Sequence, residues 1–99
     1  MTYYVEFTLE AIDDLEKPTS AIQERILSKI RWLSENLENL TPQTLSADLS
    51  SFFKLRVGDY RVVYSFDTNK QCITVHKVGH RRDIYKYLFI LVLPSELYQ

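Results

Sequence analysis

The chain has few cysteines, glycines and prolines, and it has no apolar run long enough to span a membrane. Its 99 residues include one cysteine, two glycines and three prolines. The lone Cys72 excludes an intrachain disulfide and a Cys-based metal cluster. The apolar run Leu88–Leu93 is too short to cross a bilayer, which takes about 20 residues, and the N-terminus lacks the basic and apolar regions of a signal peptide. We therefore expect one cytosolic domain over residues 1–99, without a membrane partner.

A large excess of one charge is also absent, because the formal net charge is −1. That value argues against a general nucleic-acid binder, but the charges are distributed unevenly. Residues 1–50 carry four Lys/Arg and nine Asp/Glu, whereas residues 51–99 carry eight Lys/Arg and four Asp/Glu. This asymmetry predicts a localised anion site in the second half of the chain.

The basic half contains a predicted β-hairpin that brings like charges together. If Gly58-Asp59 is a two-residue type II′ turn, Arg56 lies opposite Arg61, and Lys54 lies opposite Val63. Like charges opposite each other on one sheet face destabilise the pair. A fold tolerates them more readily if the face holds an anion, so the hairpin predicts a polyanionic partner such as nucleic acid.

The hydrophobic pattern predicts an α+β fold. Residues 3–7 alternate as a first strand, a short helix capped by Thr8 runs to about Glu16, and a Ser20/Gln23 capping box begins a longer helix. The short helix is expected to bury Leu9, Ile12 and Leu15, and the longer one Ile22, Ile26, Leu27, Ile30, Leu33 and Leu37, with Trp32 as packing.

Three antiparallel strands should follow a loop at residues 38–50, near 51–57, 60–66 and 71–78. The two-helix hairpin should then cover one face of an antiparallel sheet of three to four strands. A four-residue turn at 67–70 would set Tyr64 opposite Ile73, Val62 opposite Val75 and Arg61 opposite His76. The core face would hold Phe53, Leu55, Val62, Tyr64, Ile73 and Val75, and the other face Lys54, Arg56, Arg61, Val63, Thr74 and His76. Residues 84–93 fit either a strand or a short helix that begins at Arg82-Asp83.

The blocks Lys54–Tyr64 and Val78–Tyr85, with this order of elements, resemble the RelE/ParE superfamily of bacterial toxin–antitoxin toxins, and the second block is closer to the RelE branch. The resemblance implies an endoribonuclease that enters the ribosomal A site and cuts the bound mRNA. It also implies a cognate RelB-like antitoxin, which neutralises the toxin in a hetero-oligomer. In this family the antitoxin wraps the toxin, so we expect the apolar run Leu88–Leu93 to form part of that surface.

By position, Lys54, Arg61, Arg81 and Tyr85 match the active-site residues of RelE-like toxins. Phe52 stands where the best-studied RelE proteins carry a second lysine, a proposed general base, so the resemblance leaves the base of this chain open.

RNA cleavage by its own 2′-OH needs an acid, a base and cations around the phosphorane, but no metal or cofactor. Arginines bind phosphate oxygens in a bidentate fork, so Arg56 and Arg82 are candidate substrate-binding residues beside Arg61 and Arg81. His80 and His76 can exchange protons or stack on a base. The simpler alternatives are that Arg56 pairs with an acid (Asp59 or Asp83), that Arg82-Asp83 is a local ion pair and that His76 is structural.

Two other functions fit the same pattern. One is a ParE-type inhibitor of DNA gyrase that carries out no catalysis, which Phe52 and the near-neutral charge favour. The other is a catalytically inactive paralogue that only binds an antitoxin.

Overall fold

The computed structural model describes residues 2–44 and 51–92, with side chains described as far as residue 87. The elements run in the order β1 (Tyr4–Phe7), α1 (Leu9–Leu15), α2 (Ser20–Asn36), η1 (Leu37–Asn39), β2 (Gln43–Thr44), β3 (Phe53–Val57), β4 (Tyr60–Asp67), β5 (Cys72–His80) and α3 (Arg81–Val92). The predicted α+β order is confirmed. Residues 84–92 lie in α3, so this segment forms a helix and not the alternative strand. The predicted antitoxin-binding surface at Leu88–Leu93 falls outside the described side chains.

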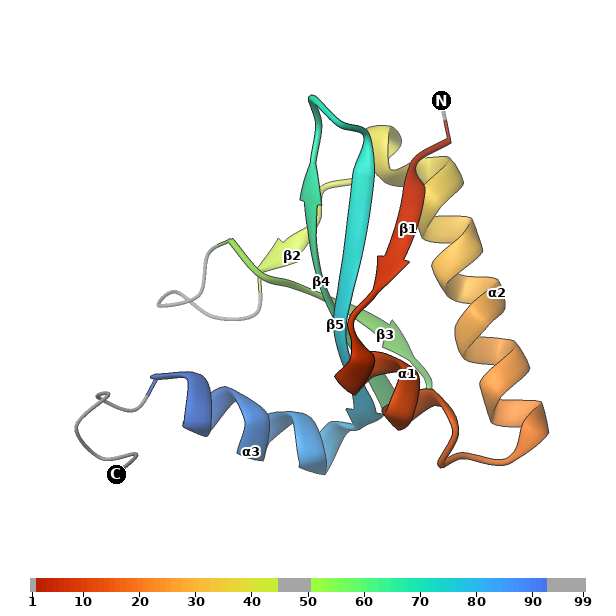
Figure 1. The fold of residues 1–99 in the computed structure, drawn as a ribbon, viewed down its shortest axis with the longest axis vertical. Coiled ribbons are helices and arrows are strands. Elements are labelled where there is room, and N and C mark those ends of the chain that lie inside the picture. Colours follow the sequence, from red (N-terminus) through yellow and green to blue (C-terminus); the bar gives the residue numbers. More distant parts are fainter. Residues whose placement is uncertain (1, 45–50, 93–99) are drawn as a thin grey trace.

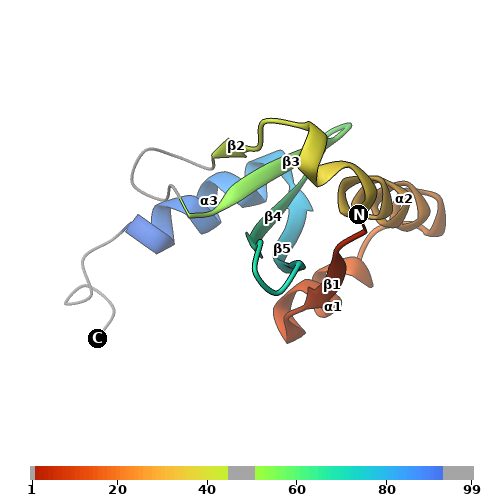
Figure 2. The ribbon, with the colours of Figure 1, turned by 90° about the horizontal axis from the view of Figure 1, so that it is seen from above.

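The sheet has five strands in the order β1-β5-β4-β3-β2, namely the predicted N-terminal strand and four strands that follow the helices. Strand β1 is parallel to β5, and the other pairs are antiparallel. The parallel pair arises because α1 and α2 carry the chain across one face before it returns to the sheet. The additional strand, β2, lies within the predicted loop and pairs with the first two residues of β3. Figures 1 and 2 show α1 and α2 on one side of the sheet and α3 on the other.

The main core fills the space between the sheet and the helices α1 and α2. All six residues predicted for the core face of the sheet belong to it. The stripe on α2 is buried at Ile26, Ile30 and Leu33, whereas Leu27 is exposed. Among the residues that the structure describes, no helix is long and apolar enough to cross a membrane.

The predicted buried face of α1 is confirmed at Leu15, which packs against the core, but is wrong at its other two positions. Leu9 is 86% exposed and Ile12 is also exposed, whereas Ala11 and Asp14 are buried. Thr8 caps the helix as predicted, by accepting a hydrogen bond from the Ala11 backbone N–H at 3.1 Å. The buried side of α1 is therefore the one that carries Ala11 and Asp14, and Asp14 bonds to β5. The N-cap residue of α2 is Thr19, whereas the sequence predicted Ser20.

The predicted pairing of β4 with β5 is also wrong, although the pairing of β3 with β4 is confirmed. Tyr64 lies opposite Val75 and Arg61 opposite Gly79, with a bulge next to Tyr64. The Asp67 side chain accepts hydrogen bonds from the backbone N–H groups of Asn69 and Lys70 at 2.9 and 3.1 Å, and Gln71 has φ 51. This turn keeps Gln71 out of the β4–β5 ladder and shifts the register of the two strands by two residues. Because side chains alternate between faces with a period of two, the residues beside the turn keep their predicted faces.

Asp14 joins α1 to β5 from a buried position. Its carboxylate accepts hydrogen bonds from the Val78 backbone N–H at 3.0 Å and from Lys77 Nζ at 3.1 Å. Lys17 Nζ lies 3.6 Å from the same carboxylate. The short helix is therefore attached to the sheet by a charge-assisted contact at the end of β5 from which α3 starts.

We expect Asp14→Ala to lower the free energy of unfolding by about 2–3 kcal/mol, because it leaves the buried Val78 N–H without its acceptor. The control is Asp13→Ala, which removes an exposed carboxylate from the same helix and brings the same gain in helix propensity. It should change stability by less than about 0.5 kcal/mol. Urea denaturation of both variants measures the difference, and equal midpoints would contradict this role of Asp14.

Candidate functional site

Three cations share the sheet face opposite α1 and α2. Arg56 on β3 lies directly opposite Arg61 on β4, and Lys54 lies opposite Val63. Gly58 has φ +59. Among the described residues, Gln71 is the only other residue with positive φ, so Asp59 does not have one. These angles agree with a type II′ turn. The turn therefore fixes the register that brings the two arginines together.

Arg61 is held in place by the turn. Its Nη1 donates to the carbonyl oxygens of Gly58 and Tyr60, both at 2.9 Å. Arg56 is exposed. Within the described residues it forms no ion pair with Asp59 or Asp83, the two acids considered as its partners from the sequence. Since a guanidinium has five N–H donors, both arginines retain donors for an anion.

Helix α3 covers part of this face. Ile84 packs on Val63, with Phe52 and Tyr87 around them. The start of the helix lies against the end of β5, since a Cβ on Gly79 would be in ordinary van der Waals contact with Asp83 Cβ at 3.5 Å. The Arg81 backbone N–H donates to the Asp59 carbonyl oxygen at 2.8 Å, which attaches the start of α3 to the β3–β4 turn.

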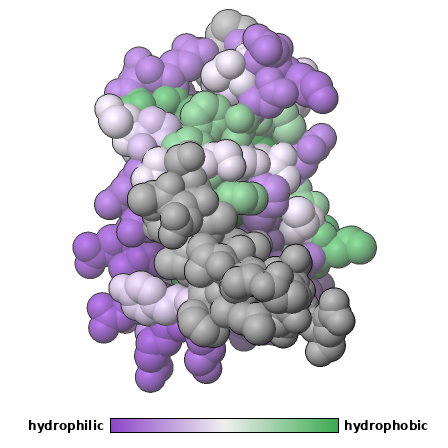
Figure 3. Space-filling model, turned by 90° about the vertical axis from the view of Figure 1, so that its left-hand side faces the viewer, coloured by the Kyte–Doolittle hydropathy of each residue, from purple (hydrophilic) through white to green (hydrophobic). Residues whose placement is uncertain are grey.

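The rotation of α3 determines where Arg81 and Tyr85 lie. Asp83 is next to Gly79 on β5, and the ring of Tyr87 lies 5.8 Å from Lys77 Nζ. At about 100° per residue, Arg81 and Tyr85 fall on the opposite flank of the helix, away from Gly79 and Lys77 of β5. Both are exposed, Tyr85 by 69%. The backbone bond from Arg81 to Asp59 sets the start of this helix beside the turn whose strands carry Arg56 and Arg61. In Figure 3 the coloured lower part of the surface, at the level of α3, is mostly hydrophilic.

His80 and Arg82 lie where β5 passes into α3. The Arg82 backbone N–H donates to His80 Nδ1 at 3.3 Å, and the His80 ring meets Tyr60 edge-on at 5.8 Å. The Arg82 side chain is exposed, and no ion pair with Asp83 occurs in the described part of the chain. His80 therefore caps the first turn of α3, while Arg82 is available to an anion.

His76 lies on the cationic face at the bulge of β5. Its Nε2 is 2.7 Å from Ser65 Oγ, and its ring meets Phe52 edge-on at 5.1 Å. Burial lowers the pKa of His76, so the imidazole is neutral near neutral pH. These contacts agree with the structural role considered from the sequence. Ser65 was missed, although it alternates with Arg61 and Val63 on the same strand face.

The arrangement can bind a phosphate group and exchange a proton. Arginine and lysine side chains from two strands and a helix provide positive charge, and the Tyr85 hydroxyl can donate or accept a proton. Among the described residues, no group of three or more His, Cys, Asp or Glu side chains could hold a metal ion. The chemistry that these residues support is therefore anion binding with proton transfer by side chains.

Comparison with known proteins gives concordant matches. A family model described as the ParE toxin of the type II toxin–antitoxin system parDE matches residues 5–85. Toxin RelG of Mycobacterium tuberculosis is 31% identical over 90 residues, which cover 87% of this chain and 99% of the relative. Among solved structures, a chain of the M. tuberculosis toxin–antitoxin complex RelBE2 matches with a TM-score of 0.73 and 27% identity, over 81% of this chain and 92% of that chain. A mutant of the E. coli toxin RelE in the free state matches with a TM-score of 0.70 and 23% identity, over 94% of this chain and 100% of that chain, and supports the fold.

We expect acid to destabilise the protein partly through His76. The unfolded chain binds a proton on this residue near pH 6.5, whereas the folded chain binds it only at lower pH. The free energy of unfolding should therefore fall as pH drops below 6.5 and level off below the lowered pKa. Denaturation from pH 7.5 to 5 should show a smaller loss for His76→Gln. His80→Gln is the control, since it changes the only other histidine and should retain the loss. An unchanged pH dependence in His76→Gln would contradict this assignment.

Proposed function

Because the chain belongs to the RelE/ParE superfamily of toxins from type II toxin–antitoxin systems, we propose that it is a ribosome-dependent endoribonuclease that cuts mRNA and so stops translation. One observation supports this function more than any other. The β3–β4 hairpin presents Lys54, Arg56 and Arg61 on the face that α3 partly covers, and α3 carries Arg81 and Tyr85 on its flank away from β5.

The proposed reaction follows from these side chains. The 2′-OH of the RNA loses its proton to water as its oxygen attacks the adjacent phosphorus, a cyclic phosphate forms, and the bond to the 5′ oxygen breaks. Arg61, Arg81 and Lys54 stabilise the charge that develops on the phosphorane, while Arg56, Arg82 and His80 bind the flanking RNA. Tyr85 gives a proton to the departing 5′ oxygen. Because Phe52 provides no ammonium group, charge stabilisation by the remaining cations carries most of the rate.

The partners follow from the same surface. One structural neighbour is the toxin of a complex with its antitoxin, and we propose a RelB-like antitoxin for this chain as well. Acidic antitoxin residues would neutralise Arg61 and Arg81 and prevent RNA from binding. The active toxin would meet mRNA in the ribosomal A site, in the cytoplasm, and would need no cofactor.

A second candidate function is inhibition of DNA gyrase. Two observations favour it, namely the match to a family model described as the ParE toxin and the aromatic residue at position 52. A gyrase inhibitor needs no proton donor, so it gives the exposed Tyr85 hydroxyl no role. Mapping of RNA 5′ ends after brief expression separates the two functions. New in-frame mRNA ends support the nuclease, whereas DNA breaks with intact mRNA support the gyrase inhibitor.

We expect Arg81→Ala and Tyr85→Phe each to reduce mRNA cleavage by about 10²–10³-fold and to relieve growth arrest, since positioned charge and proton transfer contribute effects of this size. Both side chains are exposed, so the fold should survive. Arg61→Ala is a poorer test, because the Arg61 guanidinium also bonds two carbonyl oxygens of the turn.

The matched control is Arg31→Ala, which removes an exposed arginine from α2 and should leave growth arrest unchanged. Thermal denaturation of each variant confirms that it is folded. A folded Arg81→Ala protein that cuts mRNA as fast as the unsubstituted protein would exclude Arg81 from the site.

A further inference from the structure

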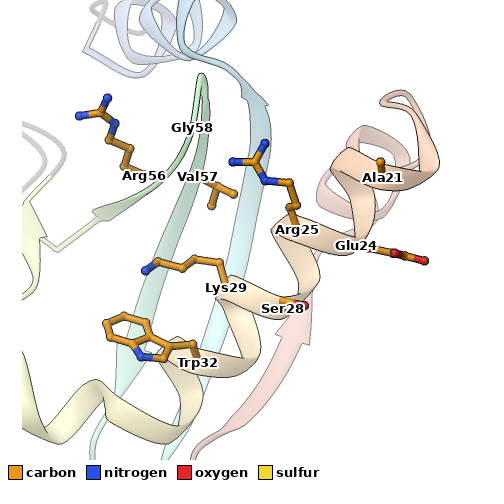
Figure 4. Close-up of a pocket in the computed structure, with 9 residues that line it drawn as sticks. All are labelled: Ala21, Glu24, Arg25, Ser28, Lys29, Trp32, Arg56, Val57 and Gly58. Atoms are coloured by element: carbon orange, nitrogen blue, oxygen red, sulfur yellow. The ribbon is translucent and has the colours of Figure 1, made fainter.

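A groove of about 710 Å³ lies between α2 and the β3–β4 hairpin, beside the proposed cleavage face. Its helical wall carries Arg25, Lys29 and Trp32, and its other wall is the end of β3. Figure 4 shows Arg25 and Lys29 reaching from α2 toward the hairpin, whereas Glu24 and Ser28 point to the other side of the helix. Six residues of α2 line the groove, namely Ala21, Glu24, Arg25, Ser28, Lys29 and Trp32, and of the charged ones the two cations extend toward the hairpin.

Two cations of α2, Arg25 and Lys29, are placed together in the groove, which Glu24 also lines. Arg25 and Lys29 are four residues apart and lie on one side of the helix, where like charges weaken it. Arg25 Nη2 would lie only 3.3 Å from a Cβ on Gly58, so its guanidinium rests against the hairpin. Within the described part of the chain, no Asp or Glu forms an ion pair with either cation. An anionic ligand in the groove would offset their repulsion.

Trp32 adds a surface for stacking. The sequence suggested a packing role, but this side chain is 41% exposed and lines the groove. Lys29 Nζ lies 4.0 Å from the centre of the ring, which keeps an ammonium next to an aromatic surface. Proteins that bind single-stranded nucleic acid use this combination, with cations along the backbone and aromatic rings against the bases.

Arg56 connects the groove with the cleavage face. It lines the groove and also lies opposite Arg61 on the cationic side of the sheet. Strand β2 pairs with β3 only at Phe53 and Lys54, so β3 is a sheet edge at Arg56, where a strand of RNA can pass from one surface to the other. In Figure 4 Arg56 leaves β3 on the side away from α2, and Val57 points toward α2.

We propose that this groove binds single-stranded RNA next to the cleavage site, with phosphates on Arg25 and Lys29 and a base on Trp32. The identity of that RNA, as message or ribosomal RNA beside the cut, rests on the proposed nuclease function. An acidic peptide would also satisfy the cations. It would need apolar pockets for its side chains, and apart from Trp32 the groove offers only Ala21 and Val57.

The single tryptophan of the chain provides a direct test. The full chain is titrated with a 2′-O-methyl oligoribonucleotide of about eight nucleotides, a length within the range of single-strand sites, which cannot be cut by attack of a 2′-OH. We expect saturable quenching of Trp32 fluorescence and an affinity that falls as salt rises. Arg25→Ala and Lys29→Ala should each weaken binding about five- to tenfold, and Trp32→Leu, followed by anisotropy of a labelled oligonucleotide, about tenfold.

Arg31→Ala is the matched control, because it removes a cation of α2 that does not line the groove, and it should bind as the unsubstituted protein does. Unchanged tryptophan fluorescence on saturation with RNA would overturn the proposal, as would equal affinities for Arg25→Ala, Lys29→Ala and Arg31→Ala. Quenching by a glutamate-rich peptide but not by RNA would make the groove a protein-binding site. The assay involves no cleavage, so intact mRNA in cells would refute the nuclease and leave this result unaffected.

Discussion

The contact of Ile84 on α3 with Val63 on β4 is the interaction on which the proposed active site depends. It holds α3 against the face that carries Lys54, Arg56 and Arg61. The same contact fixes the rotation of the helix, so that Asp83 and Tyr87 lie toward β5 and Arg81 and Tyr85 lie on the opposite flank. The proposed catalytic groups come from the β3–β4 hairpin and from α3, and this apolar contact holds the helix against the sheet face of the hairpin.

Two pairs of like charges show what the fold tolerates around that contact. Arg56 faces Arg61 across the hairpin, and Arg25 lies one helical turn from Lys29. Neither pair has an acidic partner in the described residues, whereas Asp14 is buried with Lys77 at the far side of β5. Repulsion that the protein itself does not compensate is consistent with an anion that does so in the bound state. Arg56 belongs to both surfaces and lies where they meet.

The errors in the sequence-based predictions have local physical causes. The apolar spacing of Leu9, Ile12 and Leu15 indicated a buried face, but the seven-residue helix buries Ala11 and Asp14 instead of Leu9 and Ile12, with Asp14 bonded to the Val78 backbone N–H of β5. The hydrophobic pattern predicts a four-residue turn at 67–70, whereas Asp67 pairs with Cys72 and the four-residue turn lies at 68–71, with the left-handed Gln71 at its end. A bulge at His76 then moved Arg61 opposite Gly79. None of these features changes the hydrophobic pattern, so none was visible in it.

The sequence by itself determined the order of the elements, the β3–β4 register and the pairing of Arg56 with Arg61, because strand alternation and a two-residue Gly-Asp turn act over short distances. Its basic second half also indicated an anion site. Only the tertiary structure decided that residues 81–92 form a helix, that Arg81 and Tyr85 lie on the flank of α3 away from β5, and that Trp32 lies open on a groove. Each of these depends on contacts between segments far apart in the chain, such as Ile84 with Val63 or α2 with the hairpin, which no local pattern encodes.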